Sequence, residues 1–243
     1  MQFRFPKPLH GWREFLHEIA IIVLGVLIAL GLEQLVSAAN DRASAAETRD
    51  TIRAEISENL RFMLRRQRTE ICVQRRLREI AAFLDAASQG QNVGRPTWIG
   101  APYAPLALDT AFKSAQSAGK YFLLSKDEQQ GFQIFYVDGD DFNEQSTREW
   151  YDWAQLRSLA SSEAHLTEGE VTRLTQALED ARGADSLIRV DTTEFIKLAR
   201  EGGIATRDHP ITNEQIAPAC LPMNMPYAQT LMRSARKPIG MLE

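Results

Sequence analysis

The stretch that decides the fold is uncharged and apolar over fourteen residues: IAIIVLGVLIALGL, residues 19–32. As a helix this run extends about 21 Å, which is less than the ~30 Å hydrocarbon core of a bilayer. Apolar residues on both sides lengthen it to 22 residues, from Phe15 to Val36, with a few polar side chains inside that window. Because this length is enough to cross a membrane, we expect a transmembrane helix over residues 15–36.

Two other interpretations of this stretch compete with a retained anchor. A buried core helix would need cover from the rest of the chain on every side. A cleaved signal peptide is the more serious alternative, because a basic segment precedes the run and Ser37-Ala38-Ala39 has the form of a cleavage site. Against cleavage, Glu14 and Glu18 crowd the front of the apolar run. We therefore favour an uncleaved single-pass anchor surrounded by membrane lipid.

The charges beside the span orient it only weakly. Three Lys or Arg residues precede the span and three follow it closely, so the positive-inside count is nearly balanced. We expect a cytoplasmic N-terminus, because residues 1–14 then need no translocation and the large C-terminal part is exported whole. In a bacterium this corresponds to the inner membrane, with a periplasmic C-terminal domain.

One face of the predicted span combines a carboxylate with small residues. At 100° per residue, five positions fall within about 60° of each other. They are Glu18, Gly25, Ala29, Leu32 and Val36. Gly25 and Ala29 have the small-xxx-small spacing that lets helices approach closely, and a glutamate in hydrocarbon is costly unless it is paired, protonated or near the surface. The face is therefore predicted to pack on another transmembrane helix; the alternative is that the glutamates of the span lie at the interfaces of a locally thinned bilayer.

A long amphipathic helix is predicted behind the span. Residues 40–87 contain neither Gly nor Pro, and their apolar residues recur at steps of three and four. We expect this helix to continue the membrane helix without a break and to end at Ser88-Gln89-Gly90. It carries seven arginines between Arg61 and Arg78, and residues 127–185 carry fourteen acids. We expect the basic helix to lie against the acidic part of the chain, the alternative being a solvated face.

The remaining sequence indicates further helices separated by polar turns. Capping boxes predict three helix starts, at Ser125–Glu128, Thr167–Glu170 and Asp191–Glu194. Glycines predict where most of these helices end. The expected helical ranges are 106–118, 126–137, 142–164, 167–183 and 191–202. Tyr121–Leu124 is the one stretch that reads as a short extended piece.

These elements predict an all-α fold, in which an N-terminal transmembrane helix continues into the long amphipathic helix and packs with an irregular helical bundle. The chain is expected to divide into a basic tail, the span, the long helix, the bundle and a proline-rich tail. The corresponding residues are 1–14, 15–36, 37–87, 88–208 and 209–243.

The two cysteines could join distant parts of the chain. Cys72 lies on the predicted long helix and Cys220 lies between two prolines of the tail. A disulfide between them would pin the tail to the bundle, and an exported domain would permit it. The alternative is a pair of buried free thiols.

No pattern of catalytic or metal-binding residues stands out. The four histidines have no His or Cys at metal-ligand spacing, and phosphate-loop, haem-attachment and nucleophile-elbow motifs are missing. The densest oxygen cluster, Asp138–Glu144, has Asn143 where a calcium loop needs glycine. We therefore expect no enzymatic activity, no cofactor and no bound metal. The net charge of −4 argues against a nucleic-acid partner.

Two segments resemble a group of uncharacterised bacterial single-span membrane proteins. The first is REFLHEIAIIVLGVLIAL, residues 13–30, followed at once by a long charged helix. The second is DTAFKSAQSAGKYFLLS, residues 109–125, followed by an acidic capped helix. The resemblance implies a helical, membrane-anchored protein and supplies no catalytic residue.

The expected function is that of a membrane-anchored, non-enzymatic interaction protein. It would serve as a subunit or assembly factor of a larger membrane complex, or as a homo-oligomer, with other transmembrane helices as partners. The alternative is a sensor-like or ligand-binding periplasmic ectodomain.

Overall fold

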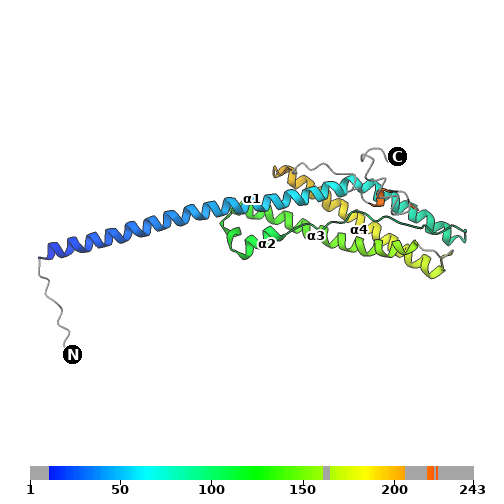
Figure 1. The fold of residues 1–243 in the computed structure, drawn as a ribbon, viewed down its shortest axis with the longest axis horizontal. Coiled ribbons are helices and arrows are strands. Elements are labelled where there is room, and N and C mark those ends of the chain that lie inside the picture. Colours follow the sequence, from blue (N-terminus) through cyan, green and yellow to red (C-terminus); the bar gives the residue numbers. More distant parts are fainter. Residues whose placement is uncertain (1–10, 161–164, 206–217, 222, 224–243) are drawn as a thin grey trace, which may run out of the picture.

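A computed structural model describes residues 11–160, 165–205, 218–221 and 223, and all regular structure in these residues is helical (Figure 1). The longest element is α1, Trp12–Ser88, a single helix of 77 residues. The predicted continuity between the apolar segment and the long amphipathic helix is therefore confirmed. α1 ends where expected, since Gln89 follows it as the cap and Gly90 adopts a left-handed φ of 73°.

α1 has two parts with different surroundings. From residue 12 to residue 36 every side chain is exposed, and this part projects alone from the rest of the molecule (Figure 1). From Ala45 onward, side chains at steps of three and four are buried, and Ile52, Ile56 and Ile80 are covered completely. The second part of α1 is therefore a core helix of the bundle, whereas the first part has no cover.

Two further long helices begin at predicted capping boxes. α3, Lys126–Leu156, starts with the Ser125–Glu128 box, and α4, Glu168–Glu201, starts with the Thr167–Glu170 box. In each box the hydroxyl accepts from the backbone N–H of the glutamate, and the carboxylate accepts from the cap backbone N–H. Both predictions are confirmed. α3 passes into the 3-10 helix η2, Arg157–Leu159, and residues 161–164 lie outside the described chain.

The predicted break in α3 is wrong, because the helix continues through Asp138–Asp141. The reason lies in tertiary packing. Gly139 is buried, and a methyl group there would lie 3.5 Å from the Cβ of Ala107. The glycine thus lies in the packed interior beside another segment, within the helix, and does not end it.

The predicted end of α4 near Gly183 is also wrong, and so is a capping box at Asp191–Glu194. α4 carries a continuous buried stripe from Leu174 to Ala199. Burial along this stripe outweighs the cost of about 1 kcal/mol for one glycine in a helix. The helix ends at Gly202, as expected.

The short elements lie beside the projecting end of the bundle. α2, Thr110–Ser117, is the core of the predicted 106–118 helix and ends before Gly119, whose φ is 73°. The next residues form the 3-10 helix η1, Lys120–Leu123, so the predicted extended piece is wrong. The Tyr121 ring is buried edge-on against Phe112, with 5.1 Å between the ring centroids, and this contact favours the tighter turn.

α1, α3 and α4 form a three-helix bundle in which α4 packs along both partners, whereas α1 and α3 make few direct contacts. The irregular residues 91–109 run between α1 and α3 (Figure 1). Two asparagines hold them. Asn59 exchanges hydrogen bonds of 2.8 and 2.7 Å with the backbone of Leu108, and Asn143 exchanges bonds of 3.0 and 2.6 Å with the backbone of Ala107.

The bundle has two apolar cores separated by a polar layer. The core near the projecting segment contains aromatic side chains of α3 and α4, such as Phe135, Phe142 and Phe195. The far core is built around Trp153 and aliphatic side chains of α1 and α4. Between them lie buried polar side chains from all three helices: Arg66, Ser146, Glu149 and Asp185.

Candidate functional site

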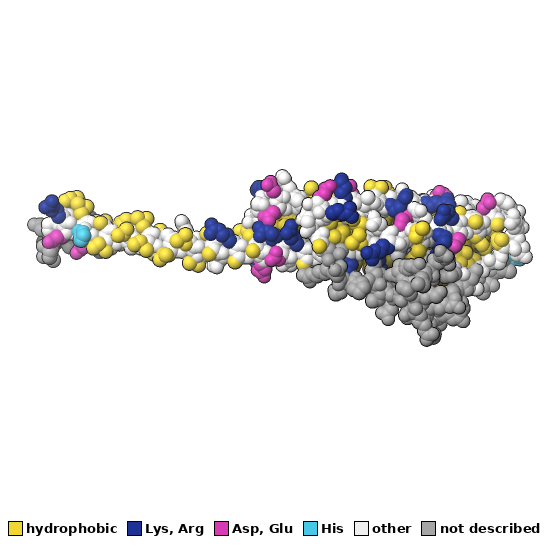
Figure 2. Space-filling model, turned by 90° about the horizontal axis from the view of Figure 1, so that it is seen from above, with side chains coloured by type: hydrophobic (Ala, Val, Ile, Leu, Met, Phe, Trp, Pro, Cys, Tyr) yellow, Lys and Arg dark blue, Asp and Glu magenta, His cyan; other side chains and the backbone are white. Residues whose placement is uncertain are grey.

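The apolar segment of α1, residues 15–36, is the first candidate site. α1 is the one described helix that is long and apolar enough to span a membrane, and its most apolar stretch has no buried residue. The alternative of a buried core helix is therefore wrong. Figure 2 shows the projecting helix lined with hydrophobic side chains, with charged side chains gathered at its outer end and where it meets the bundle.

The predicted interface residues lie on this uncovered segment. Glu18, Gly25, Ala29, Leu32 and Val36 are all exposed. No described atom lies within 4 Å of a methyl group placed on Gly25, so the rest of the described chain leaves this face free. The structure does not supply the partner that the pattern predicts, and that part stays a prediction.

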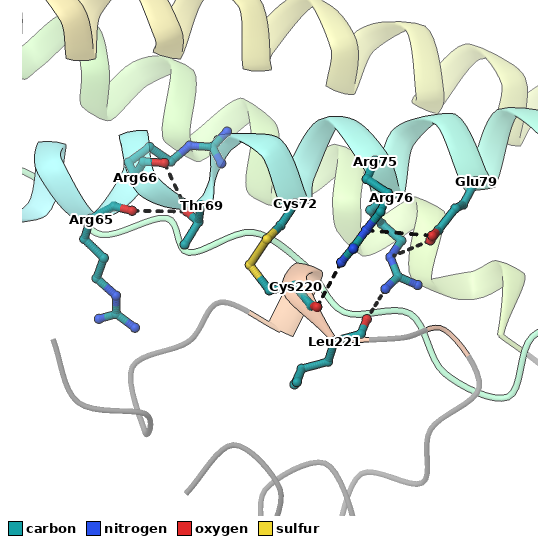
Figure 3. The surroundings of a disulfide bond; sticks show 9 residues. All are labelled: Arg65, Arg66, Thr69, Cys72, Arg75, Arg76, Glu79, Cys220 and Leu221. Carbon is teal, nitrogen blue, oxygen red and sulfur yellow. Dashed lines mark hydrogen bonds and ion pairs between the residues drawn. A yellow bond between two sulfur atoms is a disulfide. The ribbon is translucent and has the colours of Figure 1, made fainter. Parts of the chain in front are cut away.

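The second site is a disulfide that joins Cys72 of α1 to Cys220 in the tail (Figure 3). Their Cα atoms are 4.7 Å apart and they are separated by 148 residues. Cys220 belongs to the 3-10 helix η4, Pro218–Cys220. The predicted bridge is present, so the alternative of two free thiols is wrong. The remaining residues of the predicted proline-rich tail, apart from 221 and 223, lie outside the described chain.

Hydrogen bonds surround this disulfide and hold the tail backbone against α1. Arg75 donates to the carbonyl of Cys220 at 3.0 Å, and Arg76 donates to the carbonyl of Leu221 (Figure 3). Arg76 also pairs with Glu79 at 3.3 Å. We call this arrangement the tail clasp. It uses arginine side chains to satisfy carbonyl groups that burial would otherwise leave without donors.

The tail clasp also rests on the irregular segment between α1 and α3. The backbone N–H of Ala219 donates to the carbonyl of Ala101 at 2.9 Å. A methyl group on Gly100 would overlap the carbonyl of Pro218, so only glycine allows this approach. The clasp thus ties three parts of the chain together: α1, the irregular segment and the tail.

The third site is the charged layer between the two cores. Arg66 is 1% exposed, and its Nη2 donates to Glu149 Oε1 and to Asp185 Oδ1, each at 2.7 Å. These residues come from α1, α3 and α4, so one guanidinium connects all three helices. Because these groups are buried, removal of one partner would leave an unpaired charge in the interior, which is strongly destabilising.

Two further charges border this layer. Arg189 Nε lies 3.5 Å from Glu70 Oε1 and 4.0 Å from Asp185 Oδ2. Burial and the neighbouring Asp185 raise the pKa of Glu70 to about 7, although Arg66 and Arg189 oppose this. Burial raises the pKa of Glu149 to about 7, against the attraction of Arg66. Three carboxyl groups facing two guanidiniums thus favour retention of a proton.

The arginines of α1 only partly follow the prediction. α1 does pack along α4, and Arg66 does pair with acids of residues 127–185. Two other arginines have different partners: Arg61 pairs with Glu58 of its own helix, and the Arg65 guanidinium lies 3.5 Å from the centroid of the Tyr103 ring. Several arginines therefore serve the irregular segment and the tail rather than the acidic helices.

The sequence does contain a pattern that indicates burial of Arg66 and Arg76. Arg66 follows Met63 by three positions and Arg76 follows Val73 by three, so both lie on the apolar stripe of α1. A charged residue on such a stripe predicts a buried partner, which reasoning from charge totals missed. Among the described residues, no group of three or more His, Cys, Asp or Glu side chains could hold a metal ion.

Comparison of the chain with protein-family models, with curated proteins and with solved structures finds no match.

Proposed function

We propose that the protein is a membrane-anchored, non-enzymatic interaction protein. Residues 15–36 would cross the membrane, and the bundle would act as a subunit or assembly factor of a larger membrane complex, or of a homo-oligomer. The observation that carries this proposal is the uncovered apolar segment, which is continuous with the central helix of the bundle. Such a surface is stable only when lipid or another protein covers it.

The continuity of α1 supports a role in assembly. Residues 37–44 connect the apolar segment to the bundle as helix, with no loop between them. Because this connection is rigid, packing of the apolar segment in the membrane would fix the orientation of the bundle outside it. A flexible tether would not couple contacts in the membrane to contacts outside it.

The face of Gly25 and Ala29 supports a partner within the membrane. At Gly25 and Ala29 no side chain is larger than a methyl group, so a second helix could approach closely there, and Glu18 on the same face would gain from a polar partner. The competing possibility, in which lipid alone covers this face, makes a different prediction for the experiment below.

The disulfide supports a placement of the bundle outside the cytoplasm. Disulfides persist in oxidising compartments such as the bacterial periplasm and are rare in the cytosol. We therefore propose a cytoplasmic N-terminus and a periplasmic bundle in a bacterial inner membrane.

The test compares two glycine variants of the full chain in gently solubilised native membranes. Gly25→Ile places a large side chain on the proposed face, and Gly31→Ile places the same side chain on the far side of the same helix. Native mass and co-purifying proteins are measured for each. We expect an assembly larger than one chain that Gly25→Ile disrupts and Gly31→Ile preserves. A wild-type chain that migrates alone, or an assembly indifferent to Gly25→Ile, would contradict the proposal.

A further inference from the structure

A cavity of about 190 Å³ lies beside the charged layer, between α1 and α4. Water occupies about 30 Å³ per molecule in the liquid, so the cavity has room for several waters or for one small polar molecule. The residues that line it are all polar or charged, although their aliphatic carbons form more of the wall than their nitrogen and oxygen atoms do. The lining residues are Arg66, Gln67, Glu70, Arg189, Thr192 and Thr193.

Three buried donor atoms of this wall, and one buried carboxylate oxygen, Glu70 Oε1, have no hydrogen-bond partner in the described part of the chain. Arg66 uses only Nη2 for its two carboxylate partners, while its Nε and Nη1 atoms are buried without a hydrogen bond. Thr192 is 2% exposed, and its hydroxyl is likewise without a partner among the described residues. Such groups are rare in native proteins, because each buried donor left unpaired costs about 1–3 kcal/mol.

The wall of the cavity is more positive than the layer behind it. Two guanidiniums, Arg66 and Arg189, face the space together with one carboxyl group, Glu70. Glu149 and Asp185 are not among the lining residues; both accept from Arg66 Nη2, and Asp185 also lies 4.0 Å from Arg189. The raised pKa of Glu70, caused by burial and by Asp185, keeps this carboxyl partly neutral near pH 7 and weakens its repulsion of an anion.

We infer that this cavity is a binding site for a small oxyanion, either a carboxylate or a phosphate-like group, held by Arg66, Arg189 and Thr192. A group with two or more acceptor oxygens supplies what the wall lacks, and a cation would meet two guanidiniums there. The site is independent of the proposed role in membrane assembly and would add a ligand-binding function to the bundle.

The test measures thermal unfolding of the oxidised full chain in detergent micelles. Acetate represents a carboxylate, inorganic phosphate represents a phosphate-like group, and chloride at equal ionic strength is the reference. We expect a saturable rise in the unfolding midpoint with one of the two oxyanions, because a ligand that binds only the folded state stabilises it. The anion that produces the rise identifies the class of ligand. Absence of a saturable rise with either anion, relative to chloride, would overturn the inference.

Variants of the wall decide whether the response comes from this cavity. Thr192→Val keeps the shape of the side chain and removes the hydroxyl, and Arg189→Gln removes a guanidinium that is half exposed. Each is expected to raise the apparent dissociation constant at least tenfold. Arg182→Gln changes an exposed arginine of α4 that pairs with Glu179 and does not line the cavity, so it should bind like the wild type. If Thr192→Val does not fold, Arg189→Gln alone carries the comparison; an unchanged response in the folded variants would overturn the inference.

Discussion

Arg66 shows what the sequence could and could not reveal about a single residue. Its spacing from Met63 places it on the buried stripe of α1, and this much is readable from the chain. Its partners Glu149 and Asp185 are 83 and 119 residues away. No local pattern connects residues at such separations, so the pairing depends on how the three helices pack.

Replacement of Arg66 should be among the most damaging single substitutions in the bundle. Arg66→Met leaves Glu149 and Asp185 buried without their cation, and loss of one partner of a buried ion pair costs about 3–5 kcal/mol. Chemical denaturation of the full chain in detergent measures the change in the free energy of unfolding. Arg68→Met, at an exposed position of the same helix, should change it by less than about 0.5 kcal/mol. Equal effects of the two substitutions would contradict the assignment of Arg66 to the layer.

The carboxyl groups of the layer should make the protein less stable as the pH rises from 5 to 7. Glu70 and Glu149 have folded-state pKa values near 7, above the ordinary value of 4.5. In this interval the folded chain retains protons that the unfolded chain has released, so the free energy of unfolding falls with pH and levels off above pH 7. We expect a loss on the order of 2 kcal/mol.

Denaturation at fixed ionic strength between pH 5 and pH 8 measures this loss. Glu149→Gln should make the dependence shallower, because its amide does not titrate, while Glu70 and Asp191, whose pKa burial raises to about 6, still contribute. Glu128 does not interfere, since pairing with Arg49 lowers its pKa to about 2 and its contribution is complete above pH 4.5. A wild-type stability that rises between pH 5 and pH 7 would contradict the raised pKa values.

Among the elements, two of the three helix starts predicted from capping boxes are correct, whereas both predicted interruptions, at Asp138–Asp141 and near Gly183, are wrong. The capping boxes of α3 and α4 are local patterns in which each residue satisfies the other, and both were correct. The break predicted at Asp138–Asp141 is wrong, because the buried Gly139 packs beside Ala107, a residue distant in sequence. The role of the two asparagines that hold residues 91–109 was also not predicted. Their partners are backbone groups, and no residue type in the sequence marks such partners.

The contact at Gly139 predicts different outcomes for two glycines of α3. Gly139→Leu would push against Ala107 and displace the irregular segment, and overpacking of this kind costs about 1–3 kcal/mol. Gly131→Leu adds the same side chain where no atom lies within 4 Å, so improved helix propensity should stabilise by a few tenths of a kcal/mol or more. Thermal unfolding of the two variants provides the comparison. A Gly139→Leu variant as stable as Gly131→Leu would show that the close contact does not matter.

For the whole molecule, the tail clasp is a crosslink between distant parts of the chain. Closing a loop of 148 residues should stabilise the folded state by up to about 5 kcal/mol in the chain-entropy model. Cys220→Ser should therefore lower the free energy of unfolding by about 2–5 kcal/mol, measured by denaturation without reductant. Arg75→Gln, which removes one hydrogen bond of the clasp and keeps the disulfide, should cost only about 1 kcal/mol. A Cys220→Ser chain as stable as the wild type would contradict this role.

The outline of the molecule was predictable because it depends on long, strong patterns. A run of apolar residues and a stretch of 48 residues without Gly or Pro together specify one continuous helix, and Cys72 and Cys220 left only one intramolecular pairing. The charged layer, its cavity and the tail clasp were not predictable in detail, because they form where segments distant in sequence meet.

The proposed function requires that the uncovered segment of α1 is retained in the mature protein and lies in lipid. Its most direct test is N-terminal sequencing of the native protein after alkaline washing separates embedded from soluble material. We expect an uncleaved chain, with residues 15–36 present, in the membrane pellet. A product that begins at Ala39 or Asn40 and is recovered in the soluble fraction without detergent would contradict it.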